Sequence, residues 1–199
     1  MFNLKNNFSI EENYQNGLLP QRNSPSLFYR QSSCRSNLSL FSLSSENRRI
    51  LNKTAAFAFE VSPLSDFSFS LATQKTIFKW VKKLNWDFPM SSIKNIFTNH
   101  IFNRLYIWKN SPESIIAYSL CYFSNTLSHI AYVFYNPEFS HTNLPIRLTL
   151  QTIIDSHQNK LAFCYLGRFE AKPDDIGYYK RNMPGFEYFI DNKWQKFKH

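Results

Sequence analysis

The sequence predicts an α+β fold in which helices flank a mixed, largely antiparallel sheet, preceded by a small loop-rich N-terminal region. Residues 102–135 hold three successive strand-like runs separated by short turns. Amphipathic helical segments come before and after these runs, and a further strand-like run follows the second of them. The 199 residues are 43% hydrophobic and 19% charged, so the chain can bury enough apolar surface to fold, and disorder, collagen and coiled coil are poor descriptions of it.

The N-terminal 53 residues are polar and rich in Ser and Asn, and Gly17, Pro20 and Pro25 interrupt any regular period. We therefore expect loops and short strands here. Residues 38–43 alternate loosely between apolar and polar, which predicts one exposed strand, and residues 44–51 resemble a helix start with a serine cap.

The next segment changes from an extended to a helical period. Residues 54–70 carry Phe and Val at alternate positions, which indicates an extended chain. From Thr73 onward the apolar residues fall at helical spacing among lysines, which predicts an amphipathic helix. Residues 85–89 interrupt it, and residues 91–97 can form a second, shorter helix.

An antiparallel meander is predicted for the three runs, at residues 102–109, 114–123 and 128–135. A helix follows, opened by Thr142 and Pro145. The later elements are a buried strand over residues 161–166 and an aromatic, basic tail over residues 178–196, which we expect to return to the sheet edge. This order is typical of an acyltransferase-type (GNAT-like) sheet, in which the helix after the third strand faces the acyl donor.

The net charge and the cysteines limit which partners and which compartment the sequence is compatible with. The net charge of +9 is spread along the chain, which is compatible with RNA binding and equally with a solvated basic surface. Three widely spaced cysteines without a CxxC motif predict a reduced, cytoplasmic protein that needs no metal or other cofactor. No apolar run approaches the ~18 residues that would span a membrane, so we expect no membrane partner.

Several segments of the second half carry a resemblance to a known family. Residues 127–138 read LSHIAYVFYNPE, which matches a strand-to-loop motif of the form L-S-x-V-Y-x-F-Y-D-P-D. A Y-L-G strand end appears at residues 165–167, and a later Y-K…P-x-E segment at residues 179–187. With these motifs the chain resembles the aminoacyl-tRNA–protein transferases, the arginyl- and leucyl-transferases of the N-degron pathway of protein degradation.

The first half resembles the N-terminal region of the arginyltransferases, with an aromatic-Arg pair at residues 28–30, Cys34 and a basic helix at residues 45–53. We therefore expect an arginyltransferase-like region at residues 1–70 and a GNAT-like acyltransferase domain at residues 71–199. The chain departs from the family in three places. The paired cysteines are reduced to Cys34, the Asp of the D-P-D turn is Asn136, and the S-L-G before the helix has become Asn-Leu-Pro, with Pro145 in place of glycine.

The resemblance implies transfer of an amino acid of the Arg or Leu class from a charged tRNA to the N-terminal α-amine of a protein or peptide. Because an aminoacyl ester is already activated, the protein must mainly position the amine, remove its proton and stabilise the oxyanion. Glu138 is the carboxylate that could accept or relay that proton, although it could also be a surface acid.

The remaining candidates are substrate-binding residues. Aromatic residues could stack on the terminal adenosine or lie in the core, and basic residues could bind phosphate, an acidic N-terminal residue or only solvent. These candidates are Tyr29, Arg30, Arg48, Arg49, Tyr135, Asn136, Tyr165, Leu166, Gly167, Tyr179 and Lys180. His129 shows no partner in the sequence and is interpreted as a surface or packed histidine.

Two alternatives remain open. The first is an N-acyltransferase of the same fold that uses acyl-coenzyme A, although the glycine-rich loop that usually offers backbone N–H groups to a pyrophosphate is missing. The second is an RNA- or protein-binding module that has lost turnover, which the residues at Asn136 and Pro145 favour.

Overall fold

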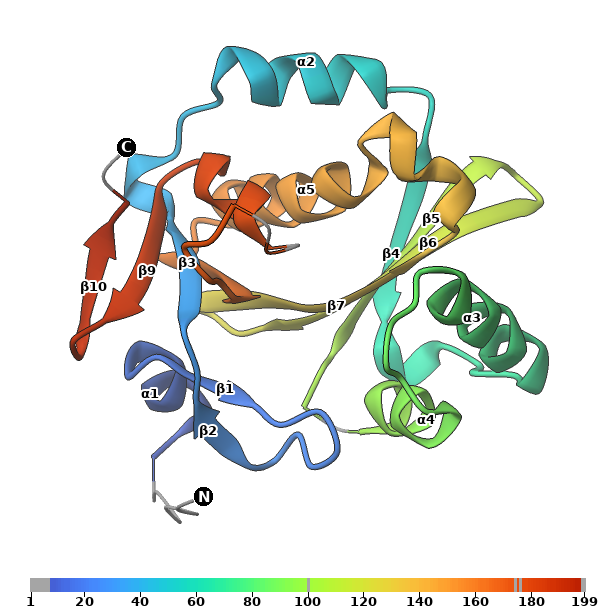
Figure 1. Ribbon diagram of the computed structural model, residues 1–199, viewed down its shortest axis with the longest axis horizontal. Helices are drawn as coiled ribbons and strands as arrows, with labels where there is room; N and C mark the ends of the chain where they lie inside the picture. The colour runs from blue at the N-terminus through green and yellow to red at the C-terminus, as the bar shows by residue number, and fades with distance from the viewer. Residues whose placement is uncertain (1–7, 100, 174, 176, 198–199) are drawn as a thin grey trace.

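The computed structural model of the protein describes residues 8–99, 101–173, 175 and 177–197. An eight-stranded sheet runs through the molecule (Figure 1). In spatial order its strands are β10 (Lys193–Lys196), β9 (Phe186–Ile190), β3 (Ser33–Asn37), β8 (Phe163–Arg168), β7 (Leu127–Tyr135), β6 (Ser114–Phe123), β5 (Arg104–Ser111) and β4 (Ala58–Pro63). The pairs are antiparallel except β7 with β8, which is parallel, so the predicted mixed, largely antiparallel sheet is confirmed.

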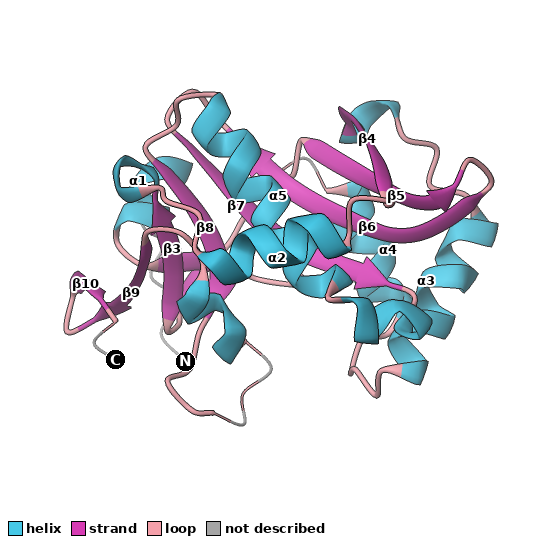
Figure 2. Ribbon diagram, turned by 90° about the horizontal axis from the view of Figure 1, so that it is seen from above, coloured by secondary structure: helices cyan, strands magenta, loops and turns pink. Residues whose placement is uncertain are grey.

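Helices cover both faces of this sheet. On one face α5 packs against β7 and β8, and α2 lies over α5 on the side away from the sheet (Figures 1 and 2). On the other face lie α3, α4, α1 and a hairpin of two short strands. The elements are α1 (Ile10–Gln15), β1 (Leu18–Pro20), β2 (Phe28–Arg30), α2 (Ser45–Lys53), α3 (Leu71–Lys83), α4 (Met90–Thr98) and α5 (Leu144–Gln158).

Each face has its own apolar core. The core under α5 includes Leu148, Ile153 and Trp108, all fully buried. The core under α3 and α4 includes Ile77 and Ile93 together with residues of the meander. The sheet is therefore sandwiched between two packed layers, and its strands are apolar on both sides where the helices cover them.

The predicted serine cap is confirmed for α2, and α3 begins with a serine cap that was not predicted from the sequence. The Ser44 hydroxyl accepts a hydrogen bond from the Asn47 backbone N–H at 3.1 Å and so begins α2. Ser70 does the same for Thr73 at 3.1 Å and begins α3. The predicted meander, the helix after it and the return of the tail to the sheet edge as β9 and β10 are also confirmed.

The strand predicted at residues 38–43 is wrong. Residues Leu38–Leu40 form a single 3₁₀ turn, and the strand is the preceding, more polar β3, which lies between β8 and β9. Its polar side chains are buried because distant partners bind them: Ser33 donates to the Gly17 carbonyl at 2.9 Å, and Arg35 pairs with Glu187 at 2.8 Å. Such long-range partners leave no apolar period in the sequence.

Residues 1–70 thus contribute β3 and β4 to the same sheet as the later strands.

Candidate active site

The central feature of the site is a split between the two parallel strands. Strands β7 and β8 are paired only where Leu127–His129 faces Phe163–Tyr165, and beyond that point they separate. Strand β7 also carries a bulge there, because Ile130 faces Cys121 and Tyr132 faces Leu120 while Ala131 has no partner in the register. The backbone of Ala131 therefore stands at the opening of the split, outside the regular ladder.

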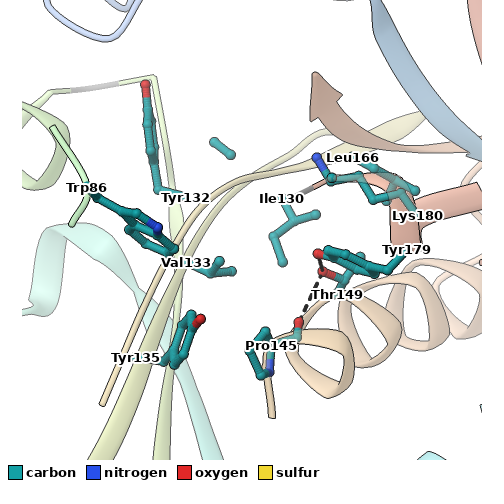
Figure 3. A pocket seen from close by; sticks show the side chains of 12 residues that line it. Trp86, Ile130, Tyr132, Val133, Tyr135, Pro145, Thr149, Leu166, Tyr179 and Lys180 are labelled. Atoms are coloured by element: carbon teal, nitrogen blue, oxygen red, sulfur yellow. Dashed lines mark hydrogen bonds between the residues drawn. The ribbon is translucent and has the colours of Figure 1, made fainter. Parts of the chain in front are cut away.

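A first cavity of about 180 Å³ opens on the α5 side of the split, and we call it the α5-side cavity. Figure 3 shows Tyr135 and Pro145 at one end, Tyr179 and Lys180 at the other, and Ile130 and Val133 between them. The lining residues are Trp86, Ile130, Ala131, Tyr132, Val133, Tyr135, Pro145, Thr149, Leu166, Gly177, Tyr179 and Lys180.

Three polar side chains of the α5-side cavity are bonded to the protein. The Tyr179 hydroxyl and the Thr149 hydroxyl are 3.0 Å apart, and burial raises the pKa of Tyr179 to about 12. The Lys180 ammonium donates to the Arg168 carbonyl at 2.7 Å, and burial lowers its pKa. Trp86 meets Tyr135 edge to face with ring centroids 5.7 Å apart. The result is a largely aromatic wall with one cation at its inner end.

A second cavity of about 230 Å³ opens on the opposite face, beside α1 and the β1–β2 hairpin, and we call it the α1-side cavity. Its lining residues are Leu19, Pro20, Arg22, Tyr29, Gln31, His129, Ala131, Tyr132, Gly167 and Arg168. Ala131 and Tyr132 border both cavities, so the two open on opposite sides of one split.

Gly167 lines the α1-side cavity and has Lys180, a residue of the α5-side cavity, beside it. A Cβ atom at this position would stand 3.8 Å from His129 Nε2 and 3.9 Å from Lys180 Nζ. The residue has a φ of +79°, which an L side chain adopts only with strain. A glycine is therefore required for backbone conformation at this position, although there is room for a methyl group.

The structure brings half of the candidate residues together. Tyr135, Leu166, Tyr179 and Lys180 line the α5-side cavity. Tyr29 and Gly167 line the α1-side cavity.

Three further candidates lie near the site without lining either cavity as described. Glu138 is exposed and pairs with Lys83 at 3.3 Å. Asn136 caps the 3₁₀ turn Pro137–Thr142, because its Oδ1 accepts from the Glu138 N–H at 3.2 Å. Tyr165 is fully buried against Tyr14, with ring centroids 4.9 Å apart, so its faces are covered by protein.

The three candidate arginines have partners elsewhere. Arg48 and Arg49 are exposed on α2; Arg48 donates to the Leu43 carbonyl at 2.5 Å, and Arg49 pairs with Glu46 at 2.6 Å. Arg30 donates to the Asn192 side chain at 2.5 Å.

Sequence reasoning missed Trp86, Ala131 and His129. Trp86 follows the end of α3 and reaches the cavity because Asn85, with a φ of +54°, turns the chain there. A bulge at Ala131 has no sequence signal, since it depends on the register with β6. His129 was interpreted as a surface or packed histidine, and it is buried with one ring nitrogen beside the α1-side cavity.

The three cysteines are buried free thiols, and burial raises the pKa of Cys34 to about 12 and that of Cys164 to about 11. Within the described residues no group of His, Cys, Asp and Glu has the arrangement of a metal site. In the same part of the chain, every helix is too short or too polar to cross a bilayer.

Neither a protein-family model nor a curated protein matches this chain. Solved structures share its fold. FemX matches with a TM-score of 0.54 and 12% identity over 75% of this chain and 57% of its own. The GCN5-related glucosamine N-acetyltransferase region of a fungal multi-domain GH3 β-N-acetylglucosaminidase matches with a TM-score of 0.51 and 10% identity, over 79% of this chain and 19% of that protein.

L-PGS from Bacillus licheniformis matches more distantly, with a TM-score of 0.47 and 12% identity over 73% of this chain and 48% of its own. The chain spans about half the length of the L-PGS structure and about a fifth of the fungal protein. The likeness establishes the fold, which is that of the GNAT acyltransferases.

Proposed function

We propose that this chain is an aminoacyltransferase that moves an amino acid from a charged tRNA to the α-amine of a protein or peptide. The observation that carries the proposal is the pair of cavities on opposite faces of the β7–β8 split, which share Ala131 and Tyr132 as lining residues. A donor ester in one cavity and an amine in the other would approach each other beside these shared residues, and holding them there supplies much of the rate.

The N-terminus of α5 favours a tRNA donor over acyl-coenzyme A. Free N–H groups in the first turn of a helix bind the pyrophosphate of a nucleotide cofactor. Here Pro145 occupies the first turn and lines the α5-side cavity, so one of those N–H groups is missing. The aromatic rings of Trp86, Tyr135 and Tyr179 in the same cavity suit an unpaired terminal nucleotide, because every base can stack on an aromatic face.

The reaction needs no covalent enzyme intermediate. The acceptor nitrogen attacks the ester carbonyl carbon, a C–N bond forms, the bond to the 3′ oxygen of the ribose breaks, and a proton from the amine ends on that oxygen. Lys180 Nζ stands at the inner end of the α5-side cavity, where its donors would stabilise the tetrahedral oxyanion. The backbone of Ala131, which has no partner in the β6 register, lines the same cavity.

The test is transfer of labelled amino acids from a mixed pool of charged tRNAs to peptides that differ only in their first residue. Acetyl-coenzyme A is the parallel donor, and the same peptides with an acetylated N-terminus are the control. We expect label from tRNA on free α-amines alone, at a rate that Lys180→Met lowers. Acetylation without aminoacylation would identify the acyl-coenzyme A enzyme instead.

A binding module without turnover is the second candidate, favoured by Asn136 and Pro145, where the resembled family has Asp and Gly. The variant Asn136→Asp with Pro145→Gly separates the two. A gain of transfer activity in a previously inactive chain would identify lost catalysis, whereas a loss of existing activity would identify a site adapted to these residues.

A further inference from the structure

The α1-side cavity is lined by a histidine whose ring orientation is held by a hydrogen bond to a buried tyrosine. His129 Nδ1 is 2.8 Å from the Tyr14 hydroxyl, and both side chains are buried. Tyr14 is itself held by rings around it: the centroid of Phe28 lies 5.4 Å away and that of Tyr165 lies 4.9 Å away. Because α1 and its neighbours hold Tyr14, the imidazole of His129 has one defined direction, and its other nitrogen, Nε2, lies toward Gly167.

The proton on this imidazole can be assigned from the hydrogen bonds. Burial raises the pKa of Tyr14 well above its usual value, so its hydroxyl keeps its proton. Within the described part of the chain, the hydrogen-bond partner of that O–H is His129 Nδ1. When Tyr14 donates, Nδ1 accepts, and the neutral ring carries its proton on Nε2. Burial and the nearby charge of Lys180 lower the pKa of His129 to about 3, which keeps the ring neutral.

This Nε2–H group is buried, and among the described residues it has no hydrogen-bond partner. An unpaired donor in the wall of a cavity costs free energy unless a ligand supplies the acceptor. The neighbouring wall also carries Tyr29, Gln31 and two arginines. Arg22 donates to the Asp87 carbonyl at 2.7 Å and Arg168 pairs with Glu170, and their positive charge still suits the cavity to a ligand that presents oxygen atoms.

We propose that His129 donates a hydrogen bond from Nε2 to the first carbonyl oxygen of the acceptor peptide and thereby places its α-amine at the β7–β8 split. His129 precedes Ala131 by two residues on β7, and both line the α1-side cavity. The first carbonyl is separated from the α-amine by one carbon atom, so a peptide can place the amine at Ala131 and the oxygen at His129. This inference rests on the proposed function for the identity of the acceptor, a peptide with a free N-terminus.

The experiment is nitrogen NMR of the full chain with labelled histidine, titrated with the peptide Ala-Ala-Ala-amide and without tRNA. Three probe peptides define the contact: the parent, the same peptide with a trans-alkene in place of its first peptide bond, and the same peptide methylated on the first peptide nitrogen. The alkene removes the carbonyl, whereas the methylated peptide retains it.

The variants are His129→Leu, which removes the donor, and His129→Gln, whose amide N–H lies near the position of Nε2. His157→Gln, outside both cavities as described, is the matched control.

We expect the Nε2–H form of His129 in the free protein and a shift of its Nε2 resonance when the parent peptide binds. The alkene peptide and the His129→Leu variant should each weaken binding about tenfold, which is the size of one hydrogen bond. The methylated peptide and His129→Gln should stay within about threefold. Tyr14→Phe removes the hydroxyl that binds Nδ1, so His129 should lose its preference for the Nε2–H form. The resonances of the other histidines should not shift.

Equal affinity for the parent and alkene peptides overturns the inference, as does an unprotonated Nε2 or the absence of any shift at millimolar peptide. These outcomes are independent of the donor. Binding that depends on His129 without transfer from tRNA would contradict the proposed function alone. Transfer from tRNA with an unchanged acceptor KM in His129→Leu would contradict this inference alone.

Discussion

The α5-side and α1-side cavities share Ala131 and Tyr132 but are built from different groups. The α5-side wall is mainly aromatic and aliphatic, and two of its hydroxyls, on Thr149 and Tyr179, bond to each other. The α1-side wall carries two arginines and the unpaired Nε2 of His129. A mainly aromatic wall favours flat, apolar surfaces, whereas a wall with positive charge and an unpaired N–H donor favours oxygen atoms.

The two cavities also come from different parts of the chain. The α5-side wall is formed mostly by β7, α5 and the segment near Tyr179, all from the second half. The α1-side wall adds residues 19–31 of the first half, and Tyr14 of α1 stands behind it. The first half of the chain therefore supplies the groups that distinguish the second cavity from the first.

The largest effect is expected at Ala131, which lines both cavities. Ala131→Phe should fill space in both cavities and lower transfer about 100-fold or more, because a displacement of about 1 Å between reacting groups has an effect of that size. The measurement is the transfer rate together with the thermal unfolding midpoint. Ala58→Phe, at an exposed position on the edge strand β4, is the matched control. Unchanged transfer in a folded Ala131→Phe variant would show that the cavities do not act together.

The pH dependence of stability tests the α1-side wall. The pKa of His129 is lowered from 6.5 to about 3 in the folded protein, so between these values the unfolded chain binds more protons than the folded one. The free energy of unfolding must then fall as the pH drops from about 6.5 toward 3. At pH 5 this protonation of the unfolded chain lowers the free energy of unfolding by about 2 kcal/mol.

His129→Gln removes this contribution. Denaturant unfolding at pH 7 and pH 5 should show a loss of stability that is smaller in the variant by about 2 kcal/mol. Tyr14, Lys180 and Arg168 lie around the imidazole and remain in both proteins. Equal losses in the two proteins would show that the imidazole is open to protonation in the folded state.

The sequence predicted the α5 face better than the opposite face for a physical reason. The meander and α5 are determined by local patterns: strand-length apolar runs separated by turn residues, and a helical period that follows Pro145. Four of the candidates that line a cavity lie on or next to these elements, including Tyr135 and Tyr179. Local patterns predict which face of an element is buried. They therefore also predicted the residues of these elements that line the α5-side cavity.

The α1 face depends on contacts between distant residues. Strand β3 is polar and buried because Ser33 and Arg35 find partners 16 and 152 residues away. Tyr14 and His129 are separated by 115 residues, and neither has a local pattern that indicates the other. Contacts of this kind are properties of the folded topology, so a single sequence could not place them.

A hydrogen bond in the α5-side wall is expected to have a smaller effect. Thr149→Val should lower the free energy of unfolding by about 1 kcal/mol, because it leaves the Tyr179 hydroxyl without its partner at 3.0 Å. Thr149→Ser retains the hydroxyl and serves as the control. In a Tyr179→Phe background the effect of Thr149→Val should shrink, and urea unfolding of the four proteins measures that coupling. Full additivity would mean that this wall is not held by the pair.

The smallest effect is expected at Glu138, which the sequence predicted as the catalytic carboxylate. Its side chain is 69% exposed, and its partner Lys83 is 47% exposed, so water screens the pair and Glu138→Gln should change the free energy of unfolding by less than about 0.5 kcal/mol. Because neither described cavity is lined by Glu138, the transfer rate should change by about twofold or less if the carboxylate acts only through this pair.

Removal of a true general base lowers the rate by about 100-fold or more. The rate of Glu138→Gln, compared with Lys83→Met, which breaks the same pair from the other side, therefore separates the two roles. A large loss confined to Glu138→Gln would place the proton acceptor at the mouth of the split, whereas two small, equal changes would leave the inner groups near Ala131 and Lys180 to carry the reaction.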